Sequence, residues 1–311
     1  MARPRKKYLD YLAYLAFRAL ETFVRMFNIR TNYCAFRLFG DIAHRFDRRH
    51  HSRSVGHLRR SFPNWPEEQY DRVARASMRS LSYLALETAF TTQLISPTTW
   101  RRHTRLANMA ENIRLMLERK SPLIFLTGHF GNWEIVAYTM SVLGFPTYVV
   151  ARPLDNPYVG DYLKALREKS GLTILDKKGV TARVDEILST RGALSWVADQ
   201  DAGRKGIFVD FFGRPASTFK SIALLAMQYD APIVVGYGLR LDQQYHFEMG
   251  IQRIIYPDEW ADKEEPQFWI TQEYTKALEE LVRTYPEQYL WQHRRWKHRP
   301  KGQQPGPDGI A

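Results

Sequence analysis

The chain has 311 residues, of which 44% are hydrophobic and 14% aromatic, enough to build a substantial core. Its only cysteine, Cys34, excludes an internal disulfide and a zinc site made of several thiolates. The formal net charge of +12 indicates an acidic partner, which can be an anionic membrane, an acidic protein or a nucleic acid.

The first predicted element is a helix over residues 8–28, which follows the basic stretch RPRKK at 3–7. Its apolar residues cover most of its surface, and its charged residues share one side: Asp10, Arg18, Glu21 and Arg25. Four charges are too many for a spanning helix, and no stretch reaches the about 18 apolar residues that one needs. The basic residues before it are followed by no small-residue cleavage site, so we do not expect a secretory signal here. We expect this helix to lie in a membrane surface; ordinary packing against the protein is the alternative.

Residues 1–115 are predicted to form a helical N-terminal region. It contains a second basic run, RFDRRHHSRSVGHLRR at 45–60, which is either a partner-binding surface or a solvated face. A helical pattern also begins after Pro66, with Glu67 and Glu68 in its first turn.

The predicted α/β core covers residues 116–300. Short apolar runs there alternate with helical segments of about 10–15 residues, which predicts a mostly parallel central sheet flanked by helices. A long helix from about residue 267 is followed by EQYLWQHRRWKHRP at 287–300. Its mixture of aromatic and basic residues is typical of a membrane interface, and also of single-stranded nucleic-acid binding. Residues 301–311 are predicted to be a disordered tail.

The segment around His129 carries the strongest chemical signal. His129 follows the first apolar run of the core, between Gly128 and Gly131, and Asn132 is positioned to cap the next helix with Glu134 in its first turn. Parallel sheets bind ligands at this end of their strands. Neutral imidazole can remove a proton from a hydroxyl, and a carboxylate on its other nitrogen fixes the tautomer. We interpret the pair as the base for direct acyl transfer from a thioester to an alcohol.

The sequence allows two other interpretations of this histidine. A buried histidine beside a helix-capping glutamate can have a purely structural role. A metal site is disfavoured because the pattern HExxH is absent and because one histidine with one glutamate supplies too few ligands.

The segment GHFGNWE at 128–134 resembles the HX4D/E block of glycerolipid-type acyltransferases, and specifically the HxGNWE block of the bacterial lipid A lauroyl/myristoyl acyltransferase family. Four further segments resemble blocks of that family in the same order. They are ARPLDNPYV at 151–159, ADQDAGRKGIFVDFFGRPASTFKSIALLA at 198–226, APIVVGYGLR at 231–240 and PEQYLWQHRRWKHRP at 286–300. The histidine block alone is a weak signal, whereas five ordered blocks between about 105 and 300 are a specific one.

The resemblance implies a glycerolipid acyltransferase-like fold and an enzyme on the cytoplasmic face of the inner membrane, attached as a peripheral or monotopic protein. It implies transfer of a fatty acyl chain from acyl carrier protein or acyl-CoA to a hydroxyl of a lipid, foremost a lipid A precursor, without cofactor or metal. His129 would be the general base, Glu134 its partner, and Arg167 an oxyanion stabiliser. The expected substrate-binding residues are Arg152, Asn132, Asp199 and Asp201.

Three alternatives remain from the sequence. The enzyme can act on another glycolipid or on a lysophospholipid, or the chain can be a membrane lipid-binding relative without catalysis. A nucleic-acid-binding protein would account for the charge but leaves the His129–Glu134 turn unexplained, so no nucleic-acid partner is predicted.

Overall fold

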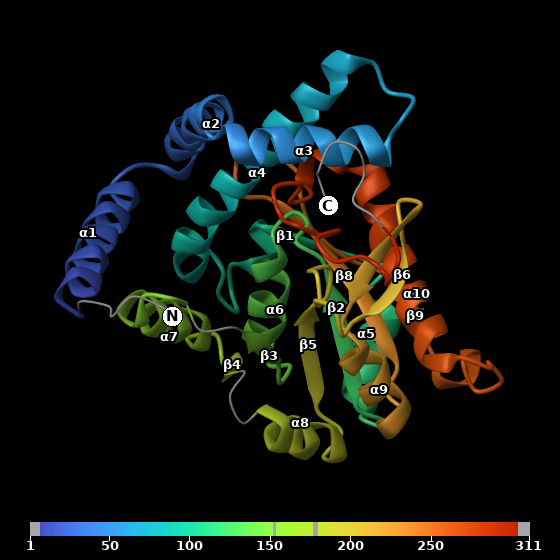
Figure 1. Ribbon diagram of the computed structural model, residues 1–311. Coiled ribbons are helices and arrows are strands. Elements are labelled where there is room, and N and C mark those ends of the chain that lie inside the picture. Colours follow the sequence, from blue (N-terminus) through green and yellow to red (C-terminus); the bar gives the residue numbers. More distant parts are fainter. Residues whose placement is uncertain (1–6, 152–153, 177–179, 304–311) are drawn as a thin grey trace.

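A seven-stranded sheet forms the centre of the protein in the computed structural model, which describes residues 7–151, 154–176 and 180–303. The strand order is β1-β9-β8-β2-β5-β3-β4, and every neighbouring pair is parallel except β8 and β9. The strands are β1 (Thr104–Ala107), β2 (Leu123–Thr127), β3 (Tyr148–Ala151), β4 (Thr173–Asp176), β5 (Ala193–Val197), β8 (Ile233–Arg240) and β9 (Phe247–Ile255). The predicted α/β fold with a mostly parallel sheet is confirmed (Figure 1).

Four helices form the N-terminal region and lie along one side and the top of the sheet in Figure 1. They are α1 (Lys7–Arg25), α2 (Ile29–Phe46), α3 (Arg48–Ser61) and α4 (Glu67–Leu94). The expectation that this region stays helical to residue 115 is wrong at residues 104–107, which form β1 and pair with β9. This edge strand is four residues long and half exposed, so it has no apolar run that a sequence pattern could reveal.

Helices cover both faces of the sheet. On one face α8 (Val180–Ser189), α9 (Lys220–Tyr229) and α10 (Pro266–Thr284) bury apolar side chains against β2, β5 and β8. On the other face lie α4, α5 (Ala110–Glu118), α6 (Trp133–Val142) and α7 (Pro157–Glu168). Because both faces are covered, the strands are apolar throughout rather than alternating.

The C-terminal segment after α10 belongs to the core and not to a membrane interface, which corrects the expectation for residues 287–300. Trp291, Arg295 and Trp296 are almost fully buried beside a two-stranded hairpin of β6 (Ile207–Phe211) and β7 (Arg214–Thr218). The Arg295 guanidinium donates to the carbonyl of Ser217 at 2.6 Å and to the hydroxyl of Thr218 at 2.7 Å. These two hydrogen bonds offset part of the cost of burying this charge. Most of the predicted tail, residues 304–311, lies outside the described residues.

Helix α1 has the opposite orientation to an ordinary surface helix. Glu21, on its charged side, is buried and accepts a hydrogen bond from Tyr162 of α7 at 2.7 Å, and it pairs with Arg18 and Arg25. The apolar side faces outward and exposes Leu9, Leu12, Leu15, Leu20, Phe23 and Met26. Among the helices that the structure describes, none combines the length and the apolar character that a membrane span requires.

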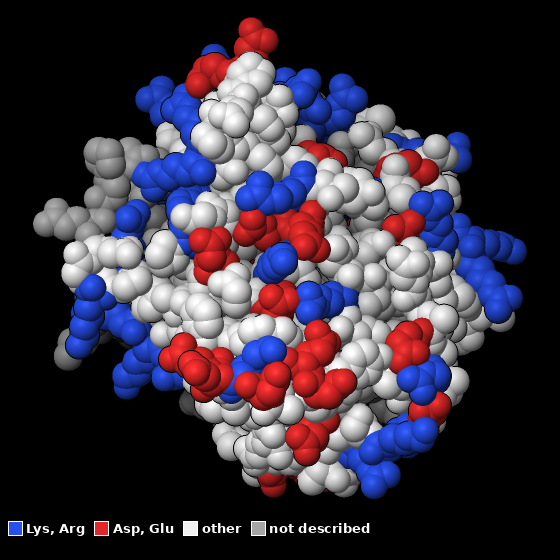
Figure 2. All heavy atoms as spheres, turned by 90° about the vertical axis from the view of Figure 1, so that its right-hand side faces the viewer, with Lys and Arg blue, Asp and Glu red and all other residues white. Residues whose placement is uncertain are grey.

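Charged residues of both signs are interspersed on the face that Figure 2 shows. The excess of positive charge is therefore not gathered into one stripe on that face, as a nucleic-acid footprint would require.

Candidate active site

A histidine–aspartate dyad forms where two neighbouring strands end. His129 follows β2 and Asp199 follows β5, and these parallel strands pair with Thr127 opposite Val197. The imidazole Nδ1 lies 2.6 Å from the Oδ1 atom of Asp199, and the backbone N–H of His129 donates to Oδ2 at 2.8 Å. Both carboxylate oxygens thus hold the histidine, one through its ring and one through its backbone.

The contacts of the ring assign the tautomer of His129. The side-chain amide nitrogen of Gln200 lies 3.2 Å from Nε2 of His129, and an amide nitrogen can only donate. Nε2 therefore carries the lone pair while Nδ1–H donates to Asp199. Burial alone would raise the pKa of the Asp199 carboxyl, but the charge and hydrogen bonds of His129 outweigh it and hold the pKa below its usual range. The dyad thus presents a basic nitrogen backed by an ionised carboxylate.

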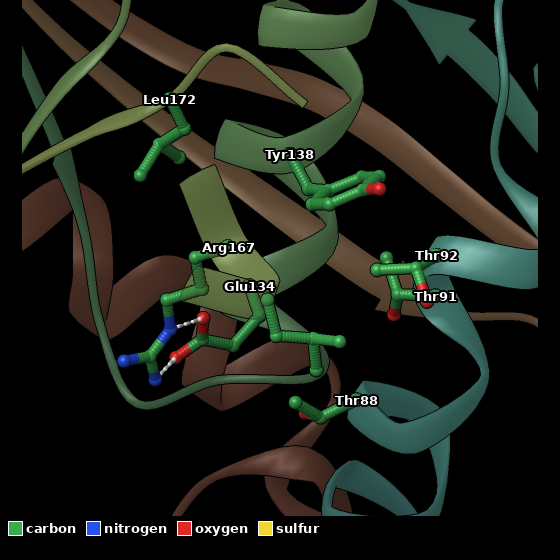
Figure 3. Close-up of a pocket in the computed structure, with 8 residues that line it drawn as sticks. Thr88, Thr91, Thr92, Glu134, Tyr138, Arg167 and Leu172 are labelled. Carbon is green, nitrogen blue, oxygen red and sulfur yellow. Dashed lines mark hydrogen bonds and ion pairs between the residues drawn. The ribbon is translucent and has the colours of Figure 1, made fainter. Parts of the chain in front are cut away.

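The carboxylate beside the imidazole is Asp199 and not Glu134, which corrects the predicted pairing. The Glu134 carboxylate instead accepts two hydrogen bonds from the Arg167 guanidinium, Nε to Oε2 and Nη2 to Oε1, both at 2.7 Å (Figure 3). Glu134 lies in the first turn of α6 and Arg167 in the last turn of α7. Sequence reasoning joined the two members of the HX4E block because they are close in the chain, whereas residue 199 becomes adjacent only through the order of the strands.

The turn that presents His129 is fixed by its backbone. Gly131 has a φ of 55°, and a Cβ atom there would lie 2.1 Å from the carbonyl oxygen of Gly238, so only glycine fits. The Asn132 side chain accepts from the N–H of Ile135, which confirms it as the cap of α6, and its amide donates to buried Glu87 at 3.0 Å. Asn132 is fully buried, so the structure gives it a structural place instead of the substrate-binding one predicted.

A cavity of about 1250 Å³ opens beside the dyad. His129, Glu134, Arg167, Gln200 and Asp201 contribute polar groups to its wall. Most of the remaining wall is apolar and includes Phe125, Trp133, Val136, Met140, Val149 and Trp196. The volume exceeds the about 300–1000 Å³ of ordinary small-molecule pockets, and it has room for an alkyl chain together with a polar group. Figure 3 shows a smaller pocket that shares Glu134 and Arg167 with this cavity and is bordered by three threonines of α4.

Two further histidines reach the site from the C-terminal segment, and sequence reasoning did not single them out. The Nδ1 atom of His298 lies 2.6 Å from Asp201 and its backbone N–H donates to the same carboxylate, which repeats the arrangement of the dyad. His293 is partly buried, and its Nε2 lies 3.2 Å from the carbonyl oxygen of Asp199. The only sequence signal for these two histidines was that they lie in the segment 286–300, which resembles a block of the acyltransferase family. A substrate-binding role for Asp201 remains a prediction, and Arg152 lies outside the described residues.

Comparison with known proteins finds a family and several relatives that are similar to this chain over most of its length. The family described as Bacterial lipid A biosynthesis acyltransferase matches residues 3–298. The chain is 28% identical over 280 residues to the lipid A biosynthesis lauroyltransferase of Escherichia coli K12, covering 85% of this chain and 84% of that protein. It is 26% identical over 249 residues to a lipid A biosynthesis acyltransferase of Haemophilus influenzae Rd, covering 78% and 76%. It is 25% identical over 269 residues to the lipid A biosynthesis palmitoleoyltransferase of Escherichia coli K12, covering 85% and 84%.

Proposed function

Because this chain belongs to the bacterial lipid A biosynthesis acyltransferase family and is therefore an acyltransferase, we propose that it acylates a hydroxyl of a lipid A precursor with His129 as general base. The donor is a fatty acyl thioester of acyl carrier protein or of coenzyme A. The observation that carries the proposal is the His129–Asp199 dyad, whose histidine lines a large and mainly apolar cavity.

The first step is proton transfer from the acceptor hydroxyl. Nε2 of His129 takes the proton as the hydroxyl oxygen attacks the thioester carbonyl carbon, and Asp199 stabilises the imidazolium that forms. Gln200 donates to Nε2 in the absence of substrate, so the acceptor hydroxyl takes the place of this amide. The tetrahedral intermediate then expels the thiolate, which receives the proton from His129. No covalent acyl-enzyme forms, because the acceptor supplies the nucleophile.

In this mechanism Glu134 acts through Arg167. Its bidentate contact fixes the guanidinium at the cavity wall, where the positive charge stabilises the oxyanion of the intermediate. The HX4E block therefore supplies two separate functions, a base in its first residue and a support for the oxyanion in its last. An oxyanion donor contributes about 3 kcal/mol to such a reaction.

We propose that α1 and α2 attach the enzyme to the membrane that holds the acceptor. The outward side of α1 is apolar, and α2 adds the exposed side chains of Leu38, Phe39, Ile42 and Phe46. Arg18 and Arg25 of α1 are paired with the buried Glu21, and an apolar face of this extent is stable where it meets lipid rather than water. The net charge of +12 favours an anionic membrane and an acidic carrier protein.

The test of the function is acyl transfer by purified protein. Incubation of the chain with acyl carrier protein thioester and a lipid A precursor should yield an acylated lipid that mass spectrometry detects. His129→Ala should lower the rate of acyl transfer about 10²–10⁴-fold, while its circular dichroism spectrum stays unchanged. His246→Ala is a matched control, because His246 makes a similar contact with Asp242 at 2.7 Å but does not line the cavity. Full activity in His129→Ala would exclude this base, and activity with coenzyme A thioesters alone would exclude the carrier protein as donor.

The membrane proposal is tested by sedimentation with vesicles that contain anionic phospholipid. Replacing Leu20 and Phe23 together by serine should move the protein from the vesicle fraction to the supernatant. Replacing exposed Leu117 of α5 by serine is the control, since this residue lies outside α1 and α2. Equal binding by both variants would contradict attachment through α1.

A further inference from the structure

Two histidines and an aspartate converge where three N-terminal helices meet, and none of them lines the active-site cavity. His44 lies in the last turn of α2, His51 in α3 and Asp71 in α4. The Nε2 atoms of His44 and His51 lie 3.0 Å and 2.8 Å from the same Oδ1 atom of Asp71. The two rings stand edge to face with their centroids 4.6 Å apart. Three helices thus place one ligand atom each around a single point.

We propose that His44, His51 and Asp71 bind one divalent transition metal ion, for which Zn²⁺ is the best candidate. Their ligand atoms lie within 4.8 Å of one another. A tetrahedral zinc ion at about 2.0–2.1 Å from each ligand separates the ligand atoms by roughly 3.3 Å. Each histidine–aspartate distance then lengthens by about 0.3–0.5 Å, and the two imidazole nitrogens, which lie within 4.8 Å of each other, approach by up to about 1.5 Å through rotation of the side chains. Two imidazoles and a carboxylate suit zinc and its neighbours, whereas Mg²⁺ and Ca²⁺ prefer oxygen ligands alone.

The surroundings leave room for an ion to enter and for a solvent ligand to complete its coordination. The Asp71 side chain is 59% exposed, while His44 is packed more deeply between the helices. Arg75 of α4, one turn after Asp71, is a positive charge that acts on His44, and it is paired with Asp41 of α2 at 2.7 Å. This pairing reduces the repulsion that a metal ion would meet from Arg75.

Binding of the ion would exchange two hydrogen bonds for three coordinate bonds. A carboxylate only accepts, so each histidine donates from Nε2 to Asp71 in the metal-free protein. Coordination requires these two nitrogens to give up their protons, either to Nδ1 of the same ring or to solvent. The ion would then link α2 and α3 to α4 through one ligand from each helix. This link would fix the orientation of α2, which carries part of the exposed apolar face.

The chain contains a control one residue away from the site. His50 belongs to the same helix as His51 and is similarly exposed, but its Nδ1 contacts Asp47 at 2.6 Å. The carboxylate of Asp47 is not one of three converging metal-ligand groups among the described residues. Removing His50 takes away a histidine–aspartate pair and leaves the three converging ligands intact.

The experiment uses the full chain without a polyhistidine tag, stripped with a chelator and titrated with Zn²⁺ alone by calorimetry. The expected result is one ion per chain, a rise in the melting temperature on binding, and a visible spectrum of tetrahedral type when Co²⁺ is the probe. His51→Ala and Asp71→Asn should each weaken binding at least tenfold and abolish the thermal shift, whereas His50→Ala should retain both.

Circular dichroism of the metal-free variants establishes that they are folded. If Asp71→Asn does not fold, His51→Ala alone tests the site. Absence of stoichiometric binding, or equal binding by His51→Ala and His50→Ala, would overturn the proposal. This outcome does not depend on acyltransferase activity.

Discussion

Two arginine–glutamate pairs lie next to the turn that presents His129, and they differ in what surrounds them. Behind the turn, Glu87 of α4 holds Arg240 of β8, with side-chain exposures of 0% and 6%. At the cavity wall, Glu134 holds Arg167, with exposures of 24% and 29%. Both contacts are bidentate, so the chemical groups are the same and only their environment separates them.

The buried pair is fully engaged by protein groups. Glu87 also accepts from the hydroxyl of Tyr33 at 2.7 Å and from the amide of Asn132 at 3.0 Å, and Arg240 donates to the hydroxyl of Ser80 at 2.8 Å. Burial alone would lower the pKa of Arg240, but the Glu87 carboxylate outweighs it and the pKa is raised. A pair in this position stabilises the turn and cannot meet a substrate. The pair at the cavity wall is open on one side, which makes it available for catalysis.

The largest expected effect is on stability, at the buried pair. Glu87→Ala leaves an uncompensated buried arginine and should lower the free energy of unfolding by about 3–5 kcal/mol, as measured by urea denaturation. The double variant Glu87→Leu with Arg240→Met should recover much of this loss, because it removes both charges. If Glu87→Ala were as stable as the parent protein, solvent would have to reach Arg240, which contradicts the expected cost of an unpaired buried charge.

The next effect concerns catalysis, at the cavity wall. Arg167→Ala should lower kcat by about 10²–10³ by removing the charge that faces the oxyanion. Its free energy of unfolding should change by less than about 1 kcal/mol, because the pair is partly solvated. Glu134→Ala should follow the same pattern more weakly. If both variants lost stability but kept kcat, the pair at the cavity wall would be structural like the one behind it.

A conservative change at the same residue sharpens the distinction between charge and geometry. Arg167→Lys keeps the positive charge but cannot form the bidentate contact with Glu134. We expect kcat to fall about tenfold, the cost of one charge-assisted hydrogen bond. Steady-state kinetics with one acyl donor tests this expectation. A loss of kcat as large as in Arg167→Ala would mean that the bidentate contact with Glu134 is required and that the positive charge alone is not enough.

The smallest effect is expected where such contacts meet solvent. Asp41 on α2 is held by Arg79 and Arg75, and their hydrogen bonds keep the pKa of its carboxyl below the usual range. A lowered folded-state pKa gives stability that is present above the ordinary pKa of about 4 and is lost as the pH falls further. Asp41→Asn should therefore cost about 0.2–1 kcal/mol at pH 7. The difference from the parent should shrink in denaturation curves recorded toward pH 2, and a difference independent of pH would contradict the ion pair.

Local sequence patterns were sufficient for much of this protein. The alternation of apolar runs and helical segments predicted the mostly parallel sheet, because strand and helix periods depend on near neighbours alone. The capping of α6 by Asn132 was predictable for the same reason. Amphipathic spacing also identified α1, but the same pattern is produced by a helix that buries its apolar side and by one that exposes it. Only the packing of Glu21 against Tyr162 of α7 decided between them.

The sequence by itself thus determined most elements of the core, their order and the presence of His129 at a strand end, but not the edge strand β1. The tertiary structure decided which carboxylate serves that histidine, which arginine pair is buried, and that residues 291–296 belong to the core. The physical reason is that hydrogen bonds and ion pairs depend on distances in space. His129 and Asp199 are 70 residues apart in the chain and meet only because β2 and β5 are neighbours in the sheet.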